Sequence, residues 1–146
     1  MKRLNKKIAI ITGAASGIGK AITQRFSSEG ASVVIADYAK DKADVLAKNL
    51  ASKGANTFPI YFSADNLESC RQLINSVFEH YGQIDILINN IGGSNLTLDK
   101  DIEHLDINYF DEIFHINIRC ATYLTQLVIP FLERQNGGNI INIASI

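Results

Sequence analysis

The sequence predicts an α/β protein built on a doubly wound parallel sheet of about five strands. Short runs of β-branched and other apolar residues alternate with longer segments of helical periodicity along the chain. Glycines follow three of the helical segments, at Gly30, Gly54 and Gly82, where a left-handed helix C-cap favours this residue. This alternation is typical of repeated β-α-β units around a parallel sheet.

The first strand is expected at residues 7–12 and the first helix at 17–29. Between them, Thr12 to Gly19 contains three glycines with the spacing G-x-x-x-G-x-G. Glycine allows a tight turn, close approach of a phosphate, and close packing of the helix on the sheet. The N–H groups at the positive end of the helix then face an anion. The turn therefore predicts a site for the pyrophosphate of a dinucleotide.

The second strand, residues 32–37, ends in Asp37, eighteen residues after Gly19. A carboxylate at this position can accept hydrogen bonds from both hydroxyls of an adenosine ribose. A purely structural turn would not need this acid. A magnesium-dependent nucleotide hydrolase is a poor alternative because Ala21, and not Ser or Thr, follows Gly19 and Lys20.

The next elements repeat the pattern. Helices are expected at 40–53 and 66–81, the second with Asn66 as its N-cap, and strands at 57–62 and 84–90. The last of these has almost no polar alternation, which is typical of a strand covered on both faces.

A long helix is expected at 107–134, followed by a strand at 139–144. The helix has apolar residues on more than one side, which implies a second partner surface. A homo-oligomer contact through this helix and coverage by further parts of the same fold both remain open.

Composition limits the possible partners. The net charge of −1 offers no field for nucleic acid or a membrane surface, and the apolar run after Lys7 is too short for a signal peptide or a membrane span. We expect a cytoplasmic protein without nucleic acid or membrane partners. Cys70 and Cys120 have no C-x-x-C spacing and no clustered histidines beside them, so we expect reduced, buried, structural thiols and no metal site.

Four features in order now match one family: the glycine turn, Asp37, the segment 89–92 (Asn-Asn-Ile-Gly), and the segment 139–145 (Asn-Ile-Ile-Asn-Ile-Ala-Ser). The chain resembles the N-terminal part of a short-chain dehydrogenase/reductase. The resemblance implies a Rossmann-type sheet with a nicotinamide cofactor across the carboxyl ends of its strands. Residues 1–146 would then be a single, truncated dinucleotide-binding domain without the family's C-terminal strands and helices.

The resemblance also assigns cofactor contacts. Asp37 and Tyr38 would lie at the adenosine ribose, and the Asp37 charge would favour NAD over NADP, although Lys40 and Lys42 are near in sequence. The phosphate contacts would come from the glycine turn, namely Gly13, Ser16, Gly17, Ile18 and Gly19.

Two further groups of cofactor contacts follow from the resemblance. Asn90 and Gly92 would line the path to the nicotinamide ribose, with Ile91 where the family usually has alanine. Ser63 and Ala64 occupy the place of the family's adenine-binding aspartate, unless Asp65 substitutes through a shift in register.

Two members of the family's catalytic tetrad have counterparts here. Asn117 would support a water in the proton relay, and Ser145 would hydrogen-bond the reacting oxygen. Otherwise Asn117 is a polar residue on a solvated helix face, and Ser145 is a turn former. The tetrad tyrosine and lysine belong to a helix after the serine, whereas Tyr38 and Lys42 lie at the adenosine end.

The resemblance predicts an NAD-dependent oxidoreductase that transfers hydride between nicotinamide and an alcohol or carbonyl substrate. A positioned acid or base contributes on the order of 10² to 10⁴ in rate, so these 146 residues alone are expected to be inactive. The alternative is a non-catalytic dinucleotide-binding remnant or an association module.

Overall fold

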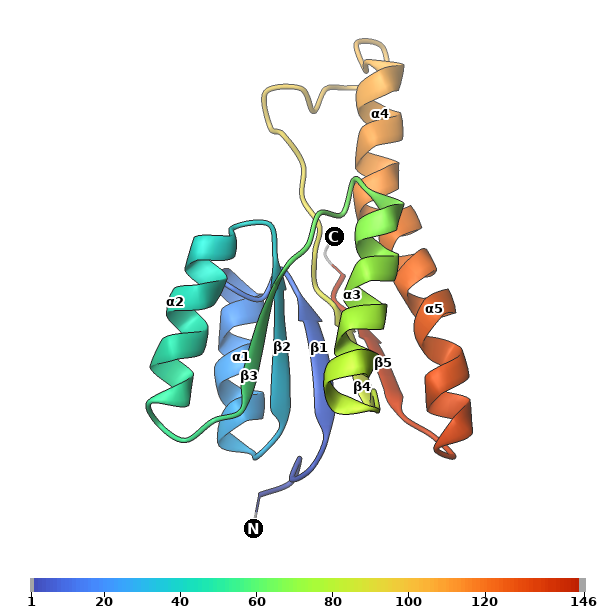
Figure 1. The fold of residues 1–146 in the computed structure, drawn as a ribbon. Coiled ribbons are helices and arrows are strands. Elements are labelled where there is room, and N and C mark those ends of the chain that lie inside the picture. Colours follow the sequence, from blue (N-terminus) through green and yellow to red (C-terminus); the bar gives the residue numbers. More distant parts are fainter. Residues whose placement is uncertain (1, 145–146) are drawn as a thin grey trace.

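The computed structural model describes residues 2–144 and contains one five-stranded parallel sheet with the strand order β3-β2-β1-β4-β5 (Figure 1). The strands are β1 (Ile8–Thr12), β2 (Ser32–Asp37), β3 (Thr57–Tyr61), β4 (Ile86–Asn89) and β5 (Asn139–Asn142). The helices are α1 (Gly17–Ser28), α2 (Lys40–Ala51), α3 (Leu67–Tyr81), α4 (Ile107–Phe114), the π-helix η1 (His115–Arg119) and α5 (Cys120–Arg134). The predicted doubly wound α/β fold is confirmed.

Each face of the sheet carries its own helical layer, because successive strand residues point in opposite directions. In β1, Ile8 and Ile10 belong to the core cluster that includes α3 and α5. Ala9 and Ile11 belong to the cluster that includes α2 and packs against α1. β1 is buried throughout, as a strand between two helical layers must be.

The strand order defines where a ligand can bind. The chain moves from β1 outward to β2 and β3, and then returns to the opposite side of β1 with β4 and β5. The segments that follow β1 and β4 therefore diverge in opposite directions. In open α/β sheets, this reversal opens a crevice at the carboxyl ends of the strands.

Local signals set the ends of α3 as the sequence predicts. The Asn66 side chain accepts a hydrogen bond from the N–H of Glu68, and Gly82 adopts the left-handed conformation with φ of 72°. The N–H of Gly82 also donates to the carbonyl of Phe78 at 2.8 Å. Both ends of this helix therefore have partners for backbone groups that would otherwise be unpaired.

The single helix predicted at 107–134 is wrong in one respect, because η1 interrupts it. Within η1, the Asn117 side-chain amide donates to the carbonyl of Ile113 at 2.9 Å. In an α-helix, that carbonyl would accept from the backbone N–H of residue 117. Pro130 lies inside α5 and is not the point of interruption.

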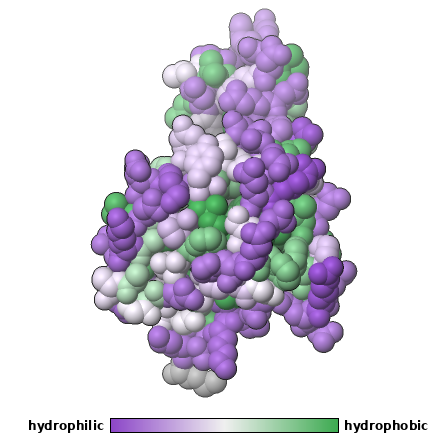
Figure 2. Space-filling model, in the orientation of Figure 1, coloured by the Kyte–Doolittle hydropathy of each residue, from purple (hydrophilic) through white to green (hydrophobic). Residues whose placement is uncertain are grey.

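The α4 helix extends beyond the carboxyl ends of the strands, and the loop before it extends in the same direction (Figure 1). Figure 2 shows apolar surface, in green, between α3 and α5. The rings of Phe78 in α3 and Phe131 in α5 lie 4.7 Å apart. Across residues 2–144, none of the helices is both long enough and apolar enough to cross a membrane.

Candidate functional site

The glycine turn between β1 and α1 leaves no room for a side chain at Gly19. A Cβ added to Gly19 would lie 2.0 Å from the carbonyl oxygen of Gly13 and 2.7 Å from Nδ2 of Asn90. Gly13 and Gly17 both have positive φ angles, of 62° and 49°. The close approach at Gly19 brings the start of α1 directly against the turn, as the sequence predicts.

The N-terminus of α1 is open to an anion. Its N-cap residue, Ser16, makes no side-chain capping hydrogen bond, whereas Asn66 and Asp106 cap α3 and α4 with their carbonyl or carboxylate oxygens. A Cβ built at Gly17 would meet nothing within 4 Å apart from its chain neighbours and the backbone of its own helix, so there is space beside the first turn. Backbone N–H groups facing open space at the positive end of a helix fit a phosphate group.

Asp37 lies at the end of β2 with its side chain directed at the glycine turn. One carboxylate oxygen accepts from the N–H of Ala15 at 2.8 Å, and the other from the N–H of Ala39 at 2.9 Å. The residue is only 8% exposed. Each oxygen keeps a further lone pair for a hydroxyl donor. Asp37 thus holds the turn in place, and its contact with a ribose stays a prediction.

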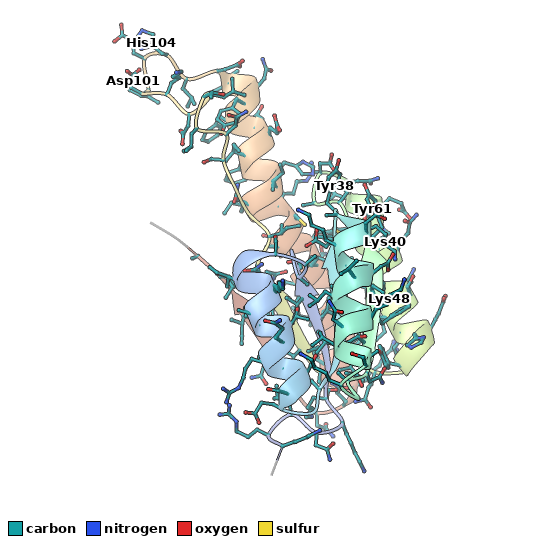
Figure 3. The ribbon with its side chains drawn as sticks, turned by 90° about the vertical axis from the view of Figure 1, so that its left-hand side faces the viewer. Tyr38, Lys40, Lys48, Tyr61, Asp101 and His104 are labelled. Atoms are coloured by element: carbon teal, nitrogen blue, oxygen red, sulfur yellow. The ribbon has the colours of Figure 1, made fainter. Side chains whose placement is uncertain are left out.

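Tyr38 follows Asp37 and is 70% exposed. Its ring lies 6.1 Å from that of Tyr61 at the end of β3, and Figure 3 shows both near the Lys40 end of α2. The Lys40 ammonium pairs with the carboxylate of Asp44 one turn later. This aromatic pair lies on the β2–β3 side of the sheet.

Ser63 and Ala64 follow β3 and precede α3. The N–H of Ser63 donates to Oγ of Ser69 at 3.1 Å, and its hydroxyl donates to the carboxylate of Asp65. Ala64 is buried. Adenine contacts by Ser63 and Ala64 stay a prediction, and Asp65 is held immediately beside them.

Asn90 and Thr12 join the ends of β4 and β1. The side-chain amide of Asn90 donates to the carbonyls of Thr12 and Gly13 at 3.0 and 3.3 Å. The Thr12 hydroxyl accepts from the N–H groups of Asn90 and Ile91 at 3.0 and 3.2 Å. These contacts fix the floor of the crevice between the two strands.

Asn117 connects η1 to the segment that follows β4. Its Oδ1 accepts from the N–H of Gly93, and its Nδ2 donates to the carbonyl of Gly93, both at 2.9 Å. A Cβ on Gly92 would lie 2.6 Å from that Oδ1. The side chain therefore contacts the backbone and is not merely a polar group on a solvated helix face. Its catalytic role stays a prediction, and Ser145 lies outside the described residues.

A second side chain, two residues further along the loop that follows β4, also forms hydrogen bonds with both the N–H and the carbonyl of one loop residue. The hydroxyl of Tyr109, a buried residue of α4, accepts from the N–H of Asn95 at 2.6 Å and donates to its carbonyl at 3.2 Å. The sequence analysis missed Tyr109, because an aromatic residue in an apolar helix pattern indicates only burial.

Asn89 is a further polar residue that the sequence analysis did not assign. It is buried, and its amide donates to Oδ1 of Asn142 at 2.9 Å and to Oγ1 of Thr125 at 3.3 Å. Its own Oδ1 has no hydrogen-bond partner among the described residues. The amide pair with Asn142 joins β4 to β5. The sequence signal that could have indicated Asn89 is its place as the first residue of the Asn-Asn-Ile-Gly segment.

These elements enclose a cleft of about 960 Å³ at the carboxyl ends of β4 and β5. Four of the predicted site residues line it, namely Ile18, Asn90, Gly92 and Asn117. Asp37, Tyr38, Ser63 and Ala64 lie outside this lining, at or after the ends of β2 and β3. Much of the remaining wall is apolar and includes Ile91, Ile113, Ile118, Ala121 and Ile143.

The parallel sheet, the reversal of strand order and the glycine turn define a Rossmann-type protein. Residues 7–146 match the family described as short chain dehydrogenase. The chain belongs to this family of oxidoreductases, and the resemblance found in the sequence is confirmed.

The comparisons with individual proteins agree with this assignment. The chain is 56% identical over 146 residues to the 7alpha-hydroxysteroid dehydrogenase of Bacteroides fragilis, covering all of this chain and 56% of that protein. It is 33% identical over 144 residues to the 3-oxoacyl-(acyl-carrier-protein) reductase of Thermotoga maritima, covering 99% of this chain and 57% of that protein.

A solved structure of a 7 alpha-hydroxysteroid dehydrogenase complexed with NADH and 7-oxo glycochenodeoxycholic acid is also similar. It has a TM-score of 0.92 and 34% identity, with coverage of 98% of this chain and 55% of that one. The chain thus spans a little over half the length of the relatives it matches.

Proposed function

We propose that residues 1–146 form one dinucleotide-binding domain of an NAD-dependent oxidoreductase that interconverts an alcohol and a carbonyl compound. The observation that carries this proposal is the uncapped N-terminus of α1, held against the glycine turn and beside Asp37. Open N–H groups suit a diphosphate, and an adjacent carboxylate suits a ribose. The NADH bound to the structural relative supports the same cofactor class.

NAD is preferred over NADP on electrostatic grounds. Asp37 carries its negative charge beside the turn, where a 2′-phosphate would meet repulsion. Lys40 is already paired with Asp44, which reduces its availability to a phosphate. Lys42 remains as a nearby positive charge in α2.

A bound nicotinamide supplies hydride transfer, and the residues of this chain position the reactants. The Thr12–Asn90 contacts fix the crevice floor, and Asn117 holds the backbone of Gly93 at its wall. Ser145 is proposed to donate a hydrogen bond to the reacting oxygen. Each role requires fixed geometry at the cleft, which these backbone clamps supply.

A hydroxysteroid is the proposed substrate. This assignment rests on the 56% identity to the dehydrogenase of Bacteroides fragilis and on the apolar residues of the cleft wall. Apolar walls with a few polar groups suit a large, rigid, largely apolar substrate.

We expect the 146 residues alone to bind cofactor without turnover. The only tyrosine with a lysine four residues later is Tyr38, and it lies on the β2–β3 side of the sheet. An unassisted tyrosine has a pKa near ~10, too high for efficient proton transfer at neutral pH.

Association through residues 107–134 also belongs to this proposal. Ile107, Phe110 and Phe114 are large apolar side chains exposed along α4. Exposed apolar rows of this kind mark contact surfaces. A homo-oligomer would cover them.

Cofactor binding is tested by titrating the purified chain with NADH and with NADPH, followed by fluorescence. We expect NADH to bind more tightly. Gly19→Ala should weaken binding at least about tenfold, because its Cβ collides with the Gly13 carbonyl and displaces the turn. Gln24→Ala, on the exposed side of α1, is the matched control and should keep the affinity.

Circular dichroism must show that both variants remain folded. Failure of the folded wild-type chain to bind NADH would overturn the proposed cofactor. Turnover of a 7-hydroxysteroid by the 146 residues would overturn the expectation of inactivity, whereas binding without turnover is the predicted result.

A further inference from the structure

Two thiols that are distant in the sequence meet in the core. Sγ of Cys70 in α3 and Sγ of Cys120 at the start of α5 lie 3.9 Å apart, although fifty residues separate them. Both side chains are fully buried in the cluster between the sheet, α3 and α5. Neither takes part in the cofactor site described above.

The two thiols have different environments. Cys70 lies in the first turns of α3, where the helix N-terminus favours a thiolate. The contact with Cys120 lowers the pKa of Cys70, and burial opposes this effect. The same contact, together with burial, raises the pKa of Cys120. The position of Cys70 at the start of α3, together with its contact with Cys120, favours Cys70 as the nucleophile of the pair.

The separation suits a cross-link. A disulfide has an S–S length near ~2.05 Å, so the sulfurs must approach each other by about 1.9 Å. The packing of α3 against α5 holds the two side chains in contact, so no distant segments have to come together first. Access by an oxidant requires a local opening of the core, because both sulfurs are buried.

We propose that Cys70 and Cys120 are an oxidative modification site at which a hydroperoxide closes a disulfide between α3 and α5. The Cys70 thiolate attacks one peroxide oxygen, the O–O bond breaks, and a sulfenic acid forms on Cys70 while hydroxide leaves. The Cys120 sulfur then attacks the Cys70 sulfur, the S–O bond breaks, and the sulfenic hydroxyl leaves as water with the proton that the Cys120 thiol gives up. Overall, two thiols are oxidised and one hydrogen peroxide is reduced to two waters.

The cross-link would act close to the proposed active site. Cys120 is the first residue of α5 and directly follows η1, which carries Asn117. Ala121, the next residue, lines the cleft. A bond from Cys120 to α3 would restrict movement at the η1–α5 junction.

The test uses the purified, reduced 146-residue chain treated with hydrogen peroxide. Denaturing mass spectrometry should show a single chain whose mass falls by about 2 Da, because two hydrogen atoms are lost. Proteolysis should give two peptides that stay joined through Cys70 and Cys120 until a thiol reductant is added. A parallel reaction in urea, with a thiol-alkylating reagent, confirms that both thiols were free at the start.

Single variants assign the order of the steps. Cys120→Ala should accumulate a sulfenic acid on Cys70, which dimedone traps. Cys70→Ala should slow oxidation of the remaining thiol at least about tenfold, because burial still raises the pKa of Cys120 and, in the middle of a continuous helix, no helix N-terminus favours its thiolate. The wild-type mass decides the central point even if either variant fails to fold.

Three results would overturn the proposal. These are thiols that stay reduced in the folded chain, oxygen atoms added to each cysteine separately, and disulfides formed only between chains. Because no cofactor is needed for this test, its outcome is independent of the proposed oxidoreductase activity.

Discussion

Gly92 and Asn117 illustrate how single residues depend on each other at this site. Oδ1 of Asn117 occupies the space that a Cβ at position 92 would need, 2.6 Å away, and the same oxygen accepts from the N–H of Gly93. Any side chain at position 92 would displace the amide and free the loop. The glycine is therefore required by Asn117, 25 residues later in the sequence.

A substitution at Tyr109 should test how far hydrogen bonding at Asn95 orders the loop that follows β4. Tyr109→Phe keeps the buried ring but removes both hydrogen bonds to the backbone of Asn95. We expect at least about tenfold faster hydrogen exchange at the Asn95 amide and a loss of about 1 kcal/mol in the free energy of unfolding.

Tyr123→Phe is the matched control for this prediction. Its ring contacts Arg71 in α3, and its hydroxyl makes no hydrogen bond within residues 2–144. Equal exchange at Asn95 in both variants would contradict the role assigned to the Tyr109 hydroxyl.

The sequence could locate motif residues, but it could not reveal most of their partners. Asn90, Gly92 and Asn117 were predicted at the site from their motifs, and all three line one cleft. Tyr109 went unnoticed because its hydroxyl acts on a backbone that no local pattern identifies. The contact between Cys70 and Cys120 was also hidden, because only the packing of α3 on α5 brings them together.

At the scale of elements, the interrupted helix shows a limit of periodicity. Apolar spacing over 107–134 predicts a helix but does not distinguish an α-helix from a short π-helix. The α-helical pattern breaks at Asn117. The side-chain amide of Asn117, and not its backbone N–H, donates to the carbonyl of Ile113. Neither glycine nor proline marks this position in the sequence. The two parts then serve different purposes, since α5 packs on α3 while α4 extends past the sheet.

The junction of β1 and β4 should be sensitive to acid through Asp85. This buried carboxylate accepts from the N–H of Ile8 and from the side chains of Lys7 and Gln83. Burial raises its pKa, but these hydrogen bonds outweigh burial and hold the pKa below its ordinary value. Asp85 therefore stabilises the fold above its unfolded pKa, and this contribution is lost as pH falls through the folded pKa.

Asp85→Asn should lower the free energy of unfolding by about 1–3 kcal/mol at pH 7, because a buried acceptor is lost. Urea denaturation at pH 7 and pH 3 should show a smaller difference between wild type and variant at the lower pH. Asp44→Asn, which breaks an exposed pair with Lys40, is the control and should have a small effect. A difference that does not change with pH would contradict the assignment.

For the whole molecule, the strand and helix pattern predicted the architecture well and the strand ends less well. Strands predicted at 57–62, 84–90 and 139–144 are each shorter in the structure. Phe62 and Ile84 are fully buried but lie just outside β3 and β4. Apolar runs report burial, whereas strand ends depend on backbone pairing, so the pattern extends past the ladder.

Association is the prediction that belongs to this scale. The stacked rings of Phe110 and Phe114, with centroids 6.2 Å apart, lie within the exposed apolar row on α4. We expect analytical ultracentrifugation to show a homo-oligomer that becomes monomeric in the double variant Phe110→Glu, Phe114→Glu. A wild-type chain that is already monomeric at high micromolar concentration would contradict this expectation.

The two hydrogen bonds of Asp37 have a consequence for protein engineering. The carboxylate that would discriminate against a 2′-phosphate also accepts hydrogen bonds from the N–H of Ala15 in the glycine turn and from the N–H of Ala39 before α2. Replacing Asp37 by a neutral residue to admit NADPH would therefore also weaken the hydrogen bond that holds the glycine turn. Binding of the diphosphate, which both dinucleotides contain, would weaken with it. A redesign of coenzyme choice has to supply a replacement acceptor for those two amides before it adds a positive charge.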